Sequence, residues 1–132
     1  MTIEAVKLSS ALSSRYGLES LHCEDWDEME LWGGIGMDAP TFAALADAAK
    51  ANGDASATVY EMESTKVEFP PVDISLDFES FNKLKANTAS LFDVAIIPRS
   101  KAWVALLTNE LRTLVYGPPQ FLETISRNLA QA

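Results

Sequence analysis

The residue types that carry most catalytic chemistry in proteins are sparse in this sequence. His22 is its only histidine, Cys23 is its only cysteine, and the two are adjacent. Neighbouring side chains of an extended segment point to opposite faces, so this spacing poorly serves a thiol nucleophile and its base. The carboxylates that follow Cys23 disfavour its reactive thiolate form. A single imidazole also excludes a histidine-rich metal site, and we expect no metal ion.

The glycine-rich run Gly33–Gly36 does not form a nucleotide-binding motif. It lacks the Lys and the Ser or Thr of a phosphate loop, and its acidic neighbours would repel a phosphate group. No Gly-x-Ser-x-Gly elbow occurs, and a Ser-His-Asp triad would have to use His22. Paired carboxylates for glycosidic chemistry stay open, because acids are abundant, but they follow no pattern. We therefore expect no catalytic residue and no cofactor, and a binding function is favoured over an enzymatic one.

An acidic segment that also contains tryptophans is the strongest functional signal. Six acids, Glu19, Glu24, Asp25, Asp27, Glu28 and Glu30, lie within twelve residues that contain no Lys or Arg. Exposed tryptophan among carboxylates is typical of a surface that meets a partner's Lys or Arg by ion pairing and cation–π contact. Alternatively, Trp26 and Trp32 are core residues flanked by solvated acids, and the sequence leaves this choice open. The predicted partner-binding residues are Glu24, Asp25, Trp26, Asp27, Glu28, Glu30 and Trp32.

The charge of the chain is unevenly distributed. Its net charge is −9; residues 1–79 contain 16 acids and 4 bases, whereas residues 80–132 contain 3 acids and 6 bases. Binding to the phosphate backbone of nucleic acid needs clustered Lys and Arg, so we expect no direct nucleic-acid binding. The acidic excess serves either solubility or recognition of a basic protein partner.

The elements that must position these residues follow from hydrophobic periodicity and turn residues. Met29 and Leu31 alternate with Glu28 and Glu30, which predicts a short strand at a sheet edge, where charges discourage unwanted pairing. The other predicted strands cover residues 57–63, 66–69, 72–76, 93–97, 102–107 and 111–116, and the predicted helices run from Thr2 to about Tyr16, from Asp38 or Ala39 to Asn52, from Asp77 past Leu84, and from Pro118 past Leu129.

The apolar stretch 91–125 is the scaffold of the predicted fold. Its three strands are joined by turns too short for the crossover that parallel strands need, so an antiparallel meander is favoured. Gly117-Pro118-Pro119 ends the third strand and starts the last helix, because proline donates no ladder hydrogen bond but fits the first helical turn. The sequence predicts one α+β domain over residues 1–132, with an antiparallel sheet that includes a C-terminal three-strand meander and about four helices packed mainly on one face. Strand order stays open.

Composition is that of an ordinary globular protein, with 48% hydrophobic and 22% charged residues in 132. We expect neither a signal peptide nor a membrane span, because the apolar runs are short and Glu4 interrupts the first of them. The single cysteine excludes an internal disulfide, which fits a cytoplasmic location.

A small acidic α+β chain that ends in AWVALLTNELRTLVYG followed by PPQFLETI resembles the immunity proteins that protect bacteria from toxins secreted by neighbouring cells. The resemblance covers about the last 35 residues and the overall charge. It implies a non-enzymatic inhibitor that neutralises a basic toxin partner, here through the acidic segment. The alternative is a small-molecule-binding or enzymatic domain with a pocket between sheet and helices. A homo-oligomer stays open.

Overall fold

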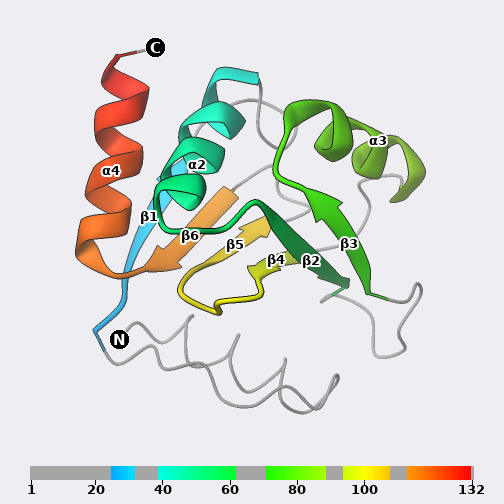
Figure 1. Cartoon of the computed structure of the whole chain (residues 1–132), viewed down its shortest axis with the longest axis horizontal. Coiled ribbons are helices and arrows are strands. Elements are labelled where there is room, and N and C mark those ends of the chain that lie inside the picture. Colours follow the sequence, from blue (N-terminus) through cyan, green and yellow to red (C-terminus); the bar gives the residue numbers. More distant parts are fainter. Residues whose placement is uncertain (1–24, 32–38, 62–70, 89–93, 108–112, 132) are drawn as a thin grey trace.

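The computed structural model describes residues 25–31, 39–61, 71–88, 94–107 and 113–131 (Figure 1). The predicted helix from Thr2 to Tyr16 and the predicted strand 66–69 lie outside these residues, as do His22 and Cys23. The described elements are β1 (Asp27–Leu31), α2 (Ala39–Ala51), β2 (Ser56–Glu61), β3 (Val72–Ser75), α3 (Phe78–Thr88), β4 (Val94–Pro98), β5 (Val104–Leu107), β6 (Thr113–Gly117) and α4 (Pro119–Ala130).

All six described strands form one antiparallel sheet in the order β1-β6-β5-β4-β2-β3. The prediction of an α+β fold with an antiparallel sheet is therefore confirmed. Its finer form is matched only in part. The strands β4, β5 and β6 pair consecutively, but they are the middle of a six-stranded sheet, and the described residues contain three helices where about four were expected.

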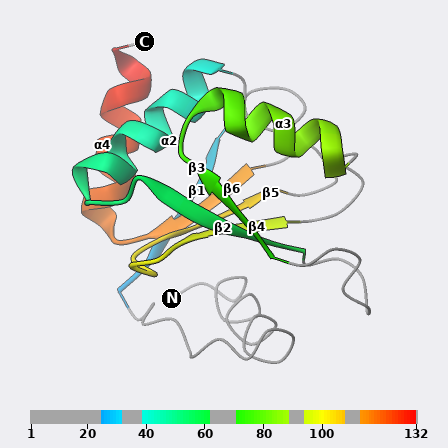
Figure 2. The same ribbon diagram turned by 45° about the vertical axis from the view of Figure 1, so that its right-hand side comes forward.

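The three described helices cover one face of the sheet, called here the helix-covered face (Figure 2). Aromatic rings fill much of the space beneath them. Phe42 of α2 stacks on Phe81 of α3 with ring centroids 4.7 Å apart, and Trp103 stacks on Phe121 of α4 at 5.3 Å. These rings are all buried, so the core of this face joins every described helix to the sheet.

Local sequence sets where these helices begin and end. Helix α3 is capped by Asp77, as its sequence predicts, because the backbone N–H of Ser80 donates to Asp77 Oδ1 at 2.7 Å. That bond and a second from the Ser80 hydroxyl lower the pKa of the Asp77 carboxyl below its ordinary value. Helix α2 ends before Gly53, whose φ of 91° suits glycine. Helix α4 starts with Pro119 at its first position.

A second apolar cluster lies on the opposite face of the same sheet. Its buried members are Trp26, Ala95, Ile97, Val104, Leu114 and Tyr116, and the partly buried Tyr60 and Leu106 pack against them. All five residues of β4 and all five of β6 are buried. Burial on both faces explains why these strands read as continuous apolar runs without alternation.

Candidate functional site

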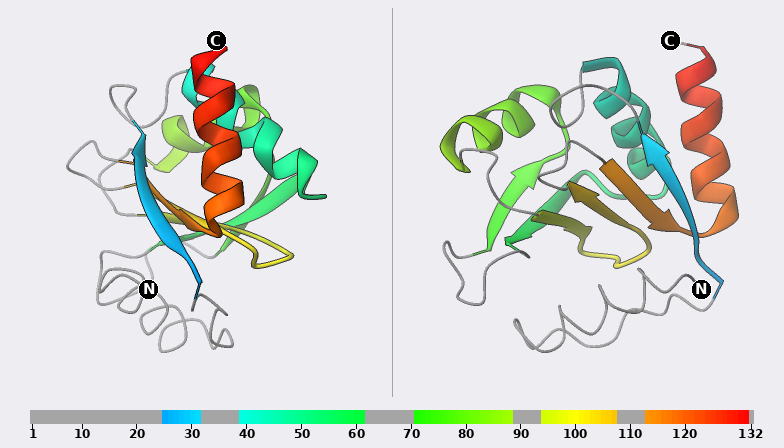
Figure 3. Two further views of the ribbon diagram at one scale, coloured as in Figure 1. Left: turned by 90° about the vertical axis from the view of Figure 1, so that its left-hand side faces the viewer. Right: turned by 180° about the vertical axis from the view of Figure 1, so that it is seen from behind.

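The acidic segment contributes the edge strand of the sheet. β1 pairs with β6 over its whole length, from Asp27 opposite Gly117 to Leu31 opposite Thr113, and it is the first strand in the sheet order. Figure 3 shows β1 along the border of the sheet, with α4 packed beside it. Among the described strands, β1 therefore has the predicted edge position. Within the described ranges, no strand pairs with the outer side of β1.

The alternation of side chains divides β1 between the two faces of the sheet. Met29 and Leu31 pack into the core of the helix-covered face. Glu28 and Glu30 point to the opposite face, because they lie across from Tyr116 and Leu114 of that face's cluster. From residue 28 onward the strand is thus apolar on one side and acidic on the other, while the exposed Asp27 lies at the start of the apolar side.

The predicted acids of this segment differ in their exposure. Asp25 and Asp27 are exposed, whereas Glu28 and Glu30 are half-buried. Asp27 Oδ1 accepts a hydrogen bond from the backbone N–H of Glu28 at 3.2 Å. Asp25 and Asp27 consequently keep most of their hydration, and their charges can attract a charged partner at long range. Glu28 is placed to interact with a partner group that lies in direct contact. Glu24 and Trp32 lie outside the described residues.

Trp26 belongs to the core of the opposite face. It is 7% exposed and packs in the cluster that contains Leu114 and Tyr116. Of the two alternatives that the sequence left open, the structure therefore supports the core residue, and Trp26 offers no ring face for a cation–π contact. Trp26 lies two residues before Glu28 and four before Glu30, so its side chain points to the same face of the sheet as theirs. Residues of β6 lie beside it on that face.

A buried carboxylate that the sequence did not single out lies between the end of α2 and the start of β2. Asp54 is 7% exposed, and its Oδ2 accepts hydrogen bonds from Asn52 Nδ2, Ser100 Oγ and Trp103 Nε1, each at 3.1 Å. These donors come from the end of α2, the β4–β5 turn and the residue before β5. Asp54 therefore links the end of α2 to the β4–β5 hairpin by hydrogen bonds, and its role is structural. In the sequence, an acid after Asn52-Gly53 resembles an ordinary turn residue.

We predict that Asp54→Ala lowers the free energy of unfolding by about 2 kcal/mol, because it leaves the buried Trp103 N–H without its acceptor. Urea titration followed by tryptophan fluorescence measures the change. Asp73→Ala is the matched control, since Asp73 is exposed and accepts one hydrogen bond, from Thr58 Oγ1. Equal effects of the two substitutions would contradict the role given to Asp54.

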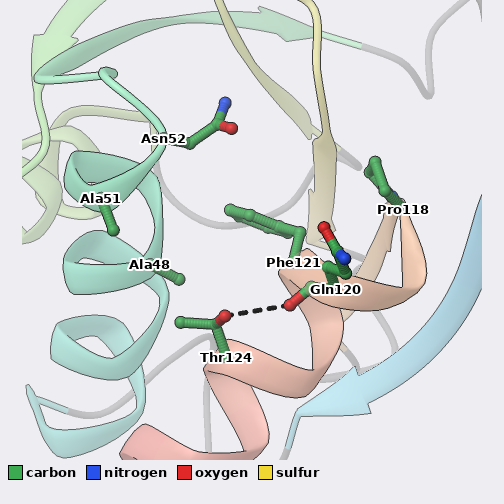
Figure 4. Close-up of a pocket in the computed structure, with 7 residues that line it drawn as sticks. All are labelled: Ala48, Ala51, Asn52, Pro118, Gln120, Phe121 and Thr124. Atoms are coloured by element: carbon green, nitrogen blue, oxygen red, sulfur yellow. Dashed lines mark hydrogen bonds between the residues drawn. The ribbon is translucent and has the colours of Figure 1, made fainter.

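A hollow of about 230 Å³ lies between α2 and α4 (Figure 4). It is lined by Ala48, Ala51, Asn52, Pro118, Gln120, Phe121 and Thr124. These side chains are amides, a hydroxyl and apolar groups, so they supply no general acid or base at neutral pH. The hollow opens between two helices, whereas the alternative function placed a pocket between sheet and helices.

A second hollow, of about 270 Å³, lies at the other end of the α2–α4 contact and is lined by Pro40, Ala43, Ala44, Asp47, Asn128 and Gln131. At this second hollow a hydrogen bond joins the two helices, because Asn128 Nδ2 donates to the backbone carbonyl of Ala44 at 3.1 Å. The two hollows lie at opposite ends of the contact between α2 and α4, and alanines of α2 line both of them.

Within the described ranges, no three His, Cys, Asp or Glu side chains gather where they could hold a metal ion. The helices of that part of the chain are also too short or too polar to cross a bilayer. Protein-family models, curated proteins and solved structures give no match to this chain. Among the described residues, the acidic strand β1 is the feature with the clearest chemical character.

Proposed function

We propose that this protein is a non-enzymatic binding protein that engages a basic protein partner through the acidic edge of its sheet. The observation that supports the proposal is the position of Asp25, Asp27 and Glu28 on or beside an edge strand. The outer side of this strand pairs with no other described strand. Edge strands offer backbone hydrogen-bonding groups, and carboxylates along such an edge select for Lys and Arg.

On the resemblance to immunity proteins, the partner would be a basic toxin domain and binding would inhibit it. An inhibitor of this kind needs no catalytic group of its own. It needs a surface whose charge is opposite to that of its target and whose shape is fixed before contact. β1 is held by its five-residue register with β6, so its carboxylates are carried by backbone that is already ordered.

The exposed acids should determine how fast the complex forms more than how long it lasts. Asp25 and Asp27 are solvated, and charge–charge attraction between solvated groups acts over a distance of about 10 Å at moderate salt. Attraction of this kind raises the rate of encounter between oppositely charged surfaces. It contributes little to the lifetime of the complex, which depends on groups that become desolvated at contact.

We predict that a variant carrying Asp25→Asn, Asp27→Asn and Glu28→Gln associates with the partner about tenfold more slowly at low salt and shows a flatter salt dependence. Affinity capture from the source organism supplies the partner, and surface-binding kinetics at two salt concentrations give the rates. The free energy of unfolding should change little, because Asp25 and Asp27 are exposed and Glu28→Gln keeps the size and shape of the half-buried side chain.

A control variant carries Asp47→Asn, Glu79→Gln and Glu123→Gln, three exposed acids of the helices. It has the same net charge as the edge variant but keeps the acids of β1. An equal loss of association rate in both variants would show that overall charge, and not the edge, attracts the partner. Unchanged association in the edge variant would overturn the proposed site.

A further inference from the structure

We infer that the partner binds as an added β-strand along the outer edge of β1, with Lys or Arg at alternate positions. This inference rests on the proposed function, because it names how the basic partner meets the acidic edge. Three observations support it: β1 pairs regularly with β6, its charged residues are all acidic, and β3 at the other edge of the sheet is a poorer pairing surface.

The outer edge of β1 is a regular pairing surface. Five successive residues of β1 lie opposite five successive residues of β6 without a bulge, so the backbone groups of every second residue of β1 face away from β6. The N–H of Glu28 already donates to Asp27 Oδ1 at 3.2 Å, so an added strand can use this donor only by replacing that bond. Helix α4 packs beside β1, yet no other described strand pairs with this edge (Figure 3). The usual devices that block an edge are bulges, prolines and charges, and β1 uses only charges.

The acids of β1 disfavour pairing with an acidic strand and favour pairing with a basic one. If a second copy of this chain added its own β1, carboxylates would face carboxylates across the new pair, which is destabilising. A strand with Lys or Arg opposite Glu28 would instead form opposite-charge pairs at a Cβ separation of about 5 Å. The edge therefore disfavours self-association and selects a basic strand.

The other edge of the sheet is a poorer pairing surface. β3 has four residues, and Pro71 precedes it directly, so an added strand cannot extend far in that direction. Its acid Asp73 already accepts a hydrogen bond from Thr58 Oγ1 at 2.7 Å. β1 is the edge with both the longer ladder and the larger group of acids.

The residues on the two faces of β1 also indicate which side chains the added strand should carry. On the opposite face, the partner's residue lies beside the half-buried Glu28 and should be basic. On the helix-covered face, its neighbour lies beside the half-buried Met29 and should be apolar. The expected recognition segment therefore alternates basic and apolar residues, as a strand with one charged face does.

The test uses an acetylated, amidated heptapeptide of alternating Lys and Val as the probe and the full-length protein. One control peptide has the same sequence with two consecutive central amides N-methylated, which removes hydrogen-bond donors from both edges of the strand. Another control has Glu in place of Lys. We expect the Lys–Val peptide to bind and the N-methylated peptide to bind at least tenfold more weakly. Bound peptide should protect alternate amides of β1 from hydrogen exchange.

The outcomes separate this inference from the proposed function. If the N-methylated peptide binds equally well and no β1 amide gains protection, strand addition is wrong while the acidic edge still attracts cations. If the Lys–Val peptide binds no better than the Glu–Val peptide, the basic-partner proposal fails as well.

Two charge-reversal variants locate the peptide on the sheet. Glu28→Lys should weaken binding of the Lys–Val peptide at least tenfold, and Asp73→Lys, on the opposite edge, should leave it unchanged. The reverse result would assign the added strand to β3 and overturn the inference.

Discussion

Trp103→Ala is expected to lower the free energy of unfolding by about 3 to 5 kcal/mol, the cost of removing a large aromatic side chain from a packed core. Trp103 is fully buried, at 0% exposure, and its ring stacks on Phe121 at 5.3 Å. Its Nε1 donates to the buried Asp54. A Cβ added at Gly117 would lie only 3.2 Å from Trp103 Cβ, so the backbone of β6 approaches this side chain closely. A denaturant titration measures the change.

Trp103→Phe separates the two contributions of the side chain. It keeps an aromatic ring against Phe121 but removes the N–H that Asp54 accepts. We expect it to destabilise by about 1 kcal/mol, the net contribution of a typical hydrogen bond, because Asp54 keeps its bonds from Asn52 and Ser100. A loss below about 1 kcal/mol for Trp103→Ala would contradict the central place given to this residue.

Much of the fold was predictable because neighbouring residues decide it. The proline at the start of α4, the Asp77 cap of α3 and the glycine after α2 are all local signals, and each of these helices forms where its signals indicate. Turns too short for a crossover likewise required antiparallel pairing of β4, β5 and β6.

Strand order could not be read from the sequence because it depends on pairings between distant segments. β1 pairs with β6, so Asp27 lies opposite Gly117, and β2 pairs with β4 although β3 and α3 lie between them in the sequence. No local pattern in either partner specifies the other. Hydrophobic alternation predicts a strand's two faces but leaves its neighbour undetermined.

The candidate site likewise has features that the local sequence predicts and features that depend on distant segments. The acids of β1 predicted an edge strand, since their spacing is a property of the strand itself. The burial of Trp26 depends on Leu114 and Tyr116, which only the β1–β6 pairing brings to its face of the sheet. The hydrogen bonds of Asp54 likewise depend on the arrival of Ser100 and Trp103 from a distant hairpin.

Trp26→Ala is expected to lower the free energy of unfolding by about 3 kcal/mol, since it removes a side chain that is 7% exposed from the cluster on the opposite face. Trp26 is the residue directly before β1, so the same substitution should loosen the start of that strand. Urea titration measures the loss of stability, and hydrogen exchange of the amides at the start of β1 reports the loosening.

Trp26→Phe tests whether Trp26 also contacts the partner. Because the ring of Trp26 is buried beside Leu114 and Tyr116, a phenylalanine there should keep β1 in place and leave both rates of partner binding unchanged. The variant with Asp25→Asn, Asp27→Asn and Glu28→Gln should instead associate slowly with the partner while its stability stays nearly native. If Trp26→Phe instead speeds dissociation while its stability is retained, the indole contacts the partner directly, and the binding surface extends from the edge of β1 onto the opposite face of the sheet.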